Sequence, residues 1–154
     1  MARRIGIDYG DRWFGLAMSD PTETIARPLE VVRGEEELWR RLEQLRREED
    51  IAGFVLGLPL NMDGSVGPKA RQVLVFKERL AERTGLPVEV WDERLTTVQA
   101  ERSLREAGAS RSRRRRDVDR VAAQILLQSF LDRQSRSGGD PAGLADGPCP
   151  GPRL

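Results

Sequence analysis

The sequence contains no histidine and a single cysteine, Cys149. A Ser-His-Asp triad, a Cys-His pair and a histidine-ligated zinc therefore cannot be built within one chain. A lone cysteine also excludes an internal disulfide framework and a zinc site made of cysteines. A hydrolytic site in this protein must consequently be built mainly from carboxylates.

Long apolar runs are also absent, and lysine is scarce. No stretch approaches the roughly 20 apolar residues of a membrane-spanning helix, and the first residues lack an apolar signal core. We therefore expect a soluble, cytoplasmic protein with no membrane partner. The 26 basic and 25 acidic residues leave a net charge of +1, so overall charge predicts no partner. Every basic residue except Lys69 and Lys77 is an arginine, which weakens any argument from arginine clusters alone.

Five short apolar runs have the length and pattern of β-strands. They lie at residues 3–8, 14–20, 25–32, 51–59 and 87–91. Pro28 in the third run predicts an edge strand or a bulge, because proline cannot donate to a strand ladder. Short turns separate the first three runs, whereas helix-length segments separate the later ones. We therefore expect three antiparallel strands followed by parallel additions in one mixed sheet.

Helical periodicity marks the segments between and after these runs. Helices are predicted at residues 35–50, at 68–84, from Thr96 or Thr97 to about 108, and at 118–133. We thus expect an α/β domain over residues 1–133, with helices on both faces of a five-stranded sheet. This order of elements matches the ribonuclease H-like arrangement, although the spacing alone does not separate it from other α/β folds. From residue 134 to 154 the chain is rich in glycine and proline and poor in apolar residues, which predicts a disordered tail.

Acidic residues fall where an α/β sheet places its functional sites. Asp8 ends the first strand, Asp92 and Glu93 follow the fifth, and Asp119 begins the last helix. Each acid also has a local role available, as a turn former, a partner of Arg94 or a first-turn helix residue. Carboxylates gathered at one sheet edge repel one another at neutral pH, and divalent cations with oxygen ligands relieve that repulsion. The pattern predicts a metal site.

Four stretches carry motifs of a known family. They read "GIDYGDRWFGLAMSD", "VLGLPLNMDGSVGPKA", "VEVWDERLTTVQAERSLREAG" and "VDRVAAQILLQSFLD", and they cover nearly the whole chain up to about residue 133. These stretches resemble the YqgF/RuvX family of pre-16S rRNA nucleases and Holliday junction resolvase-like proteins. The resemblance implies a ribonuclease H-like fold and a nuclease with two Mg²⁺ or Mn²⁺ ions. By position, it implies Asp8, Glu93 and Asp119 as catalytic metal ligands, with Asp92 as an additional candidate.

The basic segment before the last helix departs from the family, which commonly carries lysine there. It reads "RSRRRRD" and adds Asp117 as a rival to Asp119 for the metal shell. Its arginines suit a phosphate backbone, although such charge runs often form only a solvated loop. Beside the first acid, Gly6 and Gly10 are expected to leave space for metal and phosphate. The candidate nucleic-acid ligands are Arg12, Asn61, Arg94, Arg113, Arg114, Arg115 and Arg116.

Several functions are compatible with these residues. From the resemblance we favour processing of the 5′ end of precursor 16S rRNA, with resolution of four-way DNA as the alternative. A resolvase needs two active sites related by a dimer axis, and the sequence leaves a monomer or a weak homodimer open. Two other interpretations are a non-catalytic nucleic-acid-binding role in transcription or ribosome assembly, and ATP binding. The latter arises because "DYGDRWFGLAMSD" also resembles the first phosphate-contacting hairpin of actin-like ATPases and sugar kinases.

Overall fold

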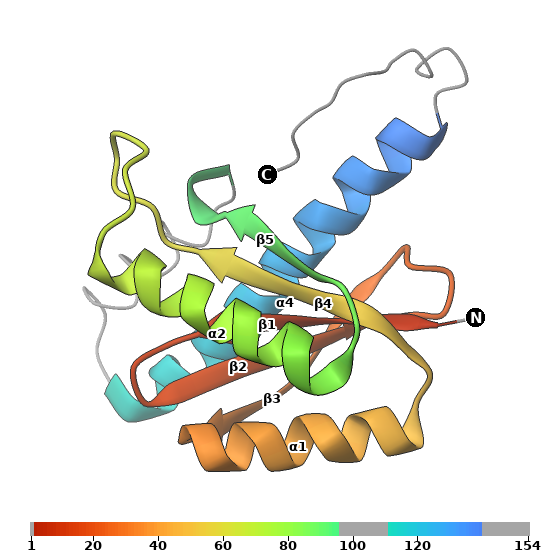
Figure 1. Ribbon diagram of the computed structural model, residues 1–154, viewed down its shortest axis with the longest axis horizontal. Helices are drawn as coiled ribbons and strands as arrows, with labels where there is room; N and C mark the ends of the chain where they lie inside the picture. Colours follow the sequence, from red (N-terminus) through yellow and green to blue (C-terminus); the bar gives the residue numbers. More distant parts are fainter. Residues whose placement is uncertain (1, 96–110, 140–154) are drawn as a thin grey trace.

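A five-stranded mixed sheet forms the centre of the molecule (Figure 1). The computed structural model describes residues 2–95 and 111–139, and for residues 111–120 and 136–139 it describes the backbone alone. The strands follow the spatial order β3-β2-β1-β4-β5. Their bounds are β1 Arg3–Tyr9, β2 Trp13–Ser19, β3 Ala26–Arg33, β4 Ile51–Leu58 and β5 Val88–Asp92.

The pairing of these strands confirms the predicted mixed sheet. β2 is antiparallel to both β1 and β3, whereas β4 is parallel to β1 and β5 is parallel to β4. Pro28 lies in β3 at the edge of the sheet, where the register with β2 shifts between Leu16 and Ala17. Both expectations for Pro28, an edge position and an irregular ladder, are therefore met. The parallel arrangement brings the ends of β1, β4 and β5 to one edge of the sheet.

Helices cover both faces of the sheet. Helix α2 (Pro68–Thr84) lies in front of the sheet in Figure 1, α1 (Glu35–Glu48) runs below β3, and α4 (Arg111–Gly139) crosses behind the sheet. Residues of α1 and α2 pack in the same core. α2 ends where its sequence predicts, because Gly85 adopts a left-handed conformation with φ of 69° and donates its N–H to the Ala81 carbonyl. A short 3-10 helix, η1 (Glu93–Leu95), follows β5 directly.

Two apolar cores are formed where the helices pack on the two faces of the sheet. In the first, strand residues such as Ile7 and Phe54 pack with Leu38 of α1 and Phe76 of α2. The second lies between the sheet and α4 and is built from small residues and leucines. Its buried members are Ala17, Ala26, Val55, Ala122, Ala123, Leu126, Leu127 and Leu131. These small residues and leucines of α4 recur at helical spacing and form its buried face.

Close packing of α4 against β1 explains why residue 6, one of two glycines near Asp8, has no side chain. A Cβ on Gly6 would lie 2.8 Å from the Leu127 Cβ and 3.2 Å from the Ala123 carbonyl oxygen, so the helix rests directly on the β1 backbone. A Cβ on Gly10 would lie 2.5 Å from the Trp13 carbonyl oxygen, inside the tight β1–β2 hairpin. The expectation that these glycines leave room for metal and phosphate was therefore wrong. They are required by helix packing and by the turn.

The final helix is longer at both ends than its sequence predicted. It begins at Arg111, so the basic segment is helical and is not a loop, and it continues through residues 134–139, which we assigned to the tail. Arginine is a good helix former, so the arginines at residues 111–116 extend the helix without apolar periodicity. The predicted helix beginning at Thr96 or Thr97 and residues 140–154 lie outside the described residues. Within those described, no helix is long and apolar enough to cross a membrane.

Candidate metal and nucleic-acid site

Two buried carboxylates lie at the edge where β1 and β5 end. Asp8 is the penultimate residue of β1 and is 2% exposed, and Glu93 directly follows β5 and is also 2% exposed. Asp8 lies two residues after Gly6, whose position faces α4, so both positions are on the α4 face of the sheet. Burying a carboxylate is costly unless a charge or donor compensates it. Two such residues at one edge therefore indicate a functional site.

Gly57 on β4 provides the surface on which Glu93 lies. A Cβ on Gly57 would be 2.5 Å from Glu93 Oε2 and 3.2 Å from Glu93 Cγ. Gly57 also faces α4, because the same Cβ would be 2.9 Å from the Leu126 Cδ2. In the parallel pair, Ile7 is opposite Leu56, so Asp8 and Gly57 are the next residues along these adjacent strands. The Glu93 carboxylate thus lies over the strand beside the one that carries Asp8.

The third predicted acid, Asp119, belongs to α4. It precedes Ala122 and Ala123 by three and four residues, and both alanines are fully buried against the sheet. The side chains of Asp119 and of its rival Asp117 lie outside the described residues. Among the side chains that are described, no group of three potential ligands is close enough to hold a metal ion. Two of the three predicted ligands can therefore be placed, and both are buried at the same edge.

Asp92, the additional metal-ligand candidate, is engaged by its neighbour Arg94. Asp92 Oδ1 accepts the Arg94 backbone N–H at 2.9 Å and Nε at 3.1 Å, and Oδ2 accepts Nη2 at 2.7 Å. These hydrogen bonds lower the pKa of Asp92 and raise that of Arg94. The remaining end of the guanidinium donates from Nη1 to the Met62 carbonyl at 3.0 Å. The two adjacent acids thus differ sharply, since Asp92 pairs with Arg94 while Glu93 is buried beneath the turn.

The loop from residue 59 to 67, which contains Asn61, is closed by its own hydrogen bonds. The Asn61 backbone N–H donates to the Ser65 carbonyl at 3.0 Å, and the Asn61 side-chain amide donates to Ser65 Oγ at 2.9 Å. Ser65 in turn donates from its backbone and hydroxyl to Asp63, and these bonds lower the pKa of that carboxyl. Gly64 has φ of 90°, which favours glycine at this turn. Asn61 is exposed, but its amide helps to shape the loop.

Basic residues lie in the hairpin turn after β1 and in the first turns of α4. Arg12 is exposed in the turn between β1 and β2, and its carbonyl accepts a hydrogen bond from the Gly34 N–H at 2.8 Å. Close by, Lys69 at the start of α2 lies 3.7 Å from Asp11 in an exposed pair. The predicted ligands Arg113, Arg114, Arg115 and Arg116 lie in the first turns of α4, and their side chains lie outside the described residues.

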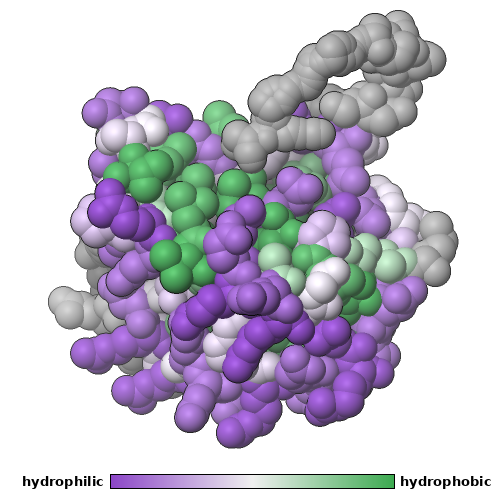
Figure 2. All heavy atoms as spheres, viewed as in Figure 1, coloured by the Kyte–Doolittle hydropathy of each residue, from purple (hydrophilic) through white to green (hydrophobic). Residues whose placement is uncertain are grey.

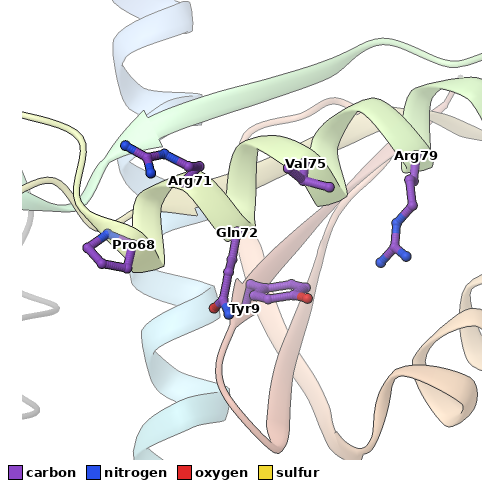
Figure 3. A pocket seen from close by; sticks show the side chains of 6 residues that line it. All are labelled: Tyr9, Pro68, Arg71, Gln72, Val75 and Arg79. Atoms are coloured by element: carbon purple, nitrogen blue, oxygen red, sulfur yellow. The ribbon is translucent and has the colours of Figure 1, made fainter.

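A shallow pocket on the opposite face of the sheet begins at Tyr9, the residue after Asp8 (Figure 3). The Tyr9 hydroxyl donates to Glu35 at 2.9 Å, and burial together with this bond raises the pKa of Tyr9 to about 12. The pocket has a volume of about 430 Å³ and is lined by Tyr9, Pro68, Arg71, Gln72, Val75 and Arg79. Sequence reasoning missed it because its residues come from a strand and a helix with no shared motif.

The chain is similar to known proteins over most of its length. A family model described as "RuvX: Holliday junction resolvase" matches residues 2–133. A Symbiobacterium thermophilum protein named "Putative pre-16S rRNA nuclease" is 46% identical over 129 residues, which cover 82% of this chain and 90% of that protein. A protein of the same name from Pelotomaculum thermopropionicum is 47% identical over 137 residues, covering 87% and 89%.

A solved structure supports the fold independently. The structure titled "T. thermophilus RuvC in complex with Holliday junction substrate" aligns with a TM-score of 0.50 and 18% identity, covering 87% of this chain and 96% of that one. At this identity the likeness concerns the fold alone, and it confirms the predicted ribonuclease H-like arrangement. Since the family model spans most of the chain and close relatives align over nearly their whole length, the protein belongs to the RuvX family.

Proposed function

We propose that this protein is a metal-dependent nuclease that hydrolyses phosphodiester bonds at the 5′ end of precursor 16S rRNA. The observation that carries the proposal is the burial of Asp8 and Glu93 at one sheet edge, with Glu93 lying over Gly57. The substrate is suggested by the name that the relatives share. The family model's description favours a second candidate substrate, four-way DNA, which the same site would cut.

The donor set fits a hard divalent cation. Asp8 and Glu93 offer only carboxylate oxygens, which are the ligands that Mg²⁺ and Mn²⁺ prefer. Asp119 would complete the shell, because it lies one turn before the alanines that contact the sheet. Bound there, two such ions would activate the attacking water and stabilise the leaving oxygen. With no histidine in the chain, the carboxylates are also the residues available to accept a proton at neutral pH.

Arginines of this chain would bind and orient the nucleic acid. Arg12 in the hairpin turn is exposed beside the strand that carries Asp8, so its guanidinium can reach a phosphate. Arg113, Arg114, Arg115 and Arg116 precede Asp119 by three to six residues in the same helix, and their positive charge would attract a phosphate backbone to this end of α4. These residues neutralise the backbone, and the carboxylates determine where it is cut.

The decisive experiment compares wild type with Asp8→Asn on a precursor 16S rRNA fragment and on a four-way DNA junction, in Mg²⁺, Mn²⁺ or EDTA. We expect metal-dependent cleavage of the RNA that falls by roughly 100-fold or more in Asp8→Asn, because a metal ligand is lost. Asp11→Asn is the matched control, since Asp11 is an exposed acid three residues away that pairs only loosely with Lys69. Cleavage that persists in EDTA or in Asp8→Asn would contradict the proposal, and preferential cutting of the junction would favour the DNA substrate.

A further inference from the structure

Arg94 makes more directed contacts than any other arginine described at this edge. Its Nε lies 3.1 Å from both carboxylate oxygens of Asp92, and its Nη2 lies 2.7 Å from Oδ2. Its Nη1 donates to the Met62 carbonyl at 3.0 Å, and a Cβ on Gly64 would lie 3.5 Å from that nitrogen. The guanidinium therefore spans the distance between the end of β5 and the loop from residue 59 to 67.

These contacts use the groups that would otherwise bind a phosphate. An arginine grips a phosphate with two parallel N–H groups, and in Arg94 the Nε–Nη2 edge already grips Asp92. The Asp92 carboxylate also cancels the charge of Arg94, so the pair adds little attraction for a nucleic-acid backbone. The expectation that Arg94 binds nucleic acid is therefore disfavoured by its geometry.

The contacts between Asp92 and Arg94 close a turn around Glu93, which lies between them in the sequence. Asp92 precedes Glu93 and Arg94 follows it, and the bond from the Arg94 backbone N–H to Asp92 Oδ1 closes the turn across Glu93. This turn begins η1 and directs the Glu93 side chain onto Gly57, where it is buried. The hydrogen bonds that hold Asp92 and Arg94 in place therefore also hold the backbone of Glu93 in place.

The loop contributes its backbone and not its side chains. Met62 accepts the Arg94 bond through its carbonyl oxygen, while its side chain is 83% exposed. On the face shown in Figure 2, apolar side chains gather near this loop and β5, whereas charged side chains cover α1. The exposed Met62 side chain can therefore be removed without deleting the bond to Arg94, which provides a matched control in the same loop.

We propose that Arg94 is a positioning residue that holds the Glu93 turn against the loop from residue 59 to 67 and does not itself contact a phosphate. The inference rests on the proposed nuclease function. It is tested with Arg94→Gln and Arg94→Lys, with Met62→Ala and the remote Arg40→Gln as controls. Arg40 is suitable because its side chain is 72% exposed and pairs with Glu37 on the surface of α1.

Cleavage kinetics and RNA binding distinguish positioning from phosphate contact. In Arg94→Gln we expect kcat to fall roughly 10- to 100-fold with little change in KM, as when a residue that orients a metal ligand is lost. The slope of binding affinity against salt stays as in wild type. Arg94→Lys restores the positive charge but not the simultaneous contacts with Asp92 and with the Met62 carbonyl, so its kcat should stay below that of the wild type. A raised KM with unchanged kcat, a slope reduced by about 0.7, or recovery in Arg94→Lys would overturn the proposal.

Amide hydrogen exchange tests, without any substrate, whether Arg94 holds the Glu93 turn against the loop from residue 59 to 67. Exchange of residues 61–66 should accelerate in Arg94→Gln and Arg94→Lys but not in Met62→Ala or Arg40→Gln. Unchanged exchange in both Arg94 variants would overturn the inference even if the enzyme cleaves RNA. Conversely, a wild-type protein that cleaves no RNA refutes the proposed function while leaving the exchange and salt measurements to decide the role of Arg94. Should Arg94→Gln fail to fold, Arg94→Lys and Asp92→Asn replace it in every measurement.

Discussion

Glu93 occupies the space that a side chain at Gly57 would need. The distance from an ideal Gly57 Cβ to Glu93 Oε2 is 2.5 Å, which is shorter than any stable contact between these atoms. Gly57 is part of a regular parallel ladder, opposite Trp91 of β5, so the backbone itself would accept alanine. Gly57 is therefore needed to leave space for the Glu93 carboxylate. Replacing this glycine tests the position of that carboxylate directly.

Gly57→Ala should weaken divalent metal binding while the protein still folds. The added methyl group must displace the Glu93 carboxylate, so we expect Mn²⁺ affinity to fall roughly 10- to 100-fold. The crowding should also cost about 1–3 kcal/mol in the free energy of unfolding, because the Leu126 Cδ2 lies 2.9 Å from the new Cβ. Isothermal titration with Mn²⁺ and denaturant unfolding measure the two effects.

Gly6→Ala is the matched control for this prediction. Its methyl group would meet the Leu127 Cβ and the Ala123 carbonyl of α4, but no carboxylate. It should therefore lower stability by a similar amount and leave Mn²⁺ affinity within about twofold of wild type. If Gly57→Ala bound Mn²⁺ as tightly as Gly6→Ala does, Glu93 would not be a metal ligand.

Divalent cations should stabilise the folded protein through Asp8 and Glu93. A ligand that binds only the native state at 100 times its dissociation constant adds about 2.7 kcal/mol to the free energy of unfolding. We expect Mg²⁺ or Mn²⁺ to raise the thermal midpoint of the wild type, and Asp8→Asn or Glu93→Gln to lose most of that increase. Asp11→Asn should retain it. Equal increases in all four proteins would mean that the cations bind elsewhere.

Much of the fold could be predicted because local patterns and tertiary structure agree. Gly85 ends α2 with a positive φ, as a glycine after an amphipathic helix predicts. Pro28 lies on the edge strand because an interior strand would need its missing N–H. The last helix was predicted over residues 118–133, and residues such as Ala122 and Leu126, which recur at helical spacing, pack against the sheet. In each case one residue type permits only one local arrangement.

The candidate site was harder to predict because it depends on contacts between distant segments. Asp92 and Glu93 are adjacent acids, yet one pairs with Arg94 and the other is buried over Gly57. Nothing in the local sequence separates them, since the difference arises from a 3-10 turn and from a glycine on another strand. Gly6 was misjudged for the same reason, because the helix that needs it lies more than a hundred residues later.

The Tyr9 hydroxyl should titrate near pH 12, about two units above a free tyrosine. Because the folded state holds this proton more tightly than the unfolded chain, its contribution to stability is complete below pH 10. That contribution is lost as the pH rises through 12. Tyr9 is the only tyrosine, so the ultraviolet band of tyrosinate, followed in EDTA, reports its titration alone.

Tyr9→Phe provides the counterpart of that titration. The variant loses the hydrogen bond to Glu35, which still pairs with Arg79 at 2.8 Å, so we expect a loss of about 1 kcal/mol at neutral pH. Between pH 10 and 12 its stability should fall less steeply than that of the wild type. A wild-type tyrosinate transition near pH 10 would show instead that the Tyr9 hydroxyl is neither buried nor bonded to Glu35 in solution.

The arginines at the start of α4 should determine the salt dependence of RNA binding. Each contact with a single-stranded phosphate contributes about 0.7 to the slope of log affinity against log salt. Replacing Arg113, Arg114, Arg115 and Arg116 with glutamine should therefore flatten the slope by as much as about 2.8, and the helix should persist because glutamine is nearly as good a helix former as arginine.

A control for this charge removal is the double variant Arg40→Gln and Arg47→Gln. Both residues are exposed on α1, away from the edge that carries Asp8 and Glu93. The control lowers the net charge without touching the proposed binding surface, so its slope should match that of the wild type. Fluorescence anisotropy of a labelled precursor 16S rRNA fragment over a range of salt concentrations measures all three proteins. If the two sets of variants flattened the slope equally per charge removed, the basic segment would act only through net charge. A loss confined to the α4 variant would instead identify this segment as a direct phosphate-binding surface next to the carboxylates.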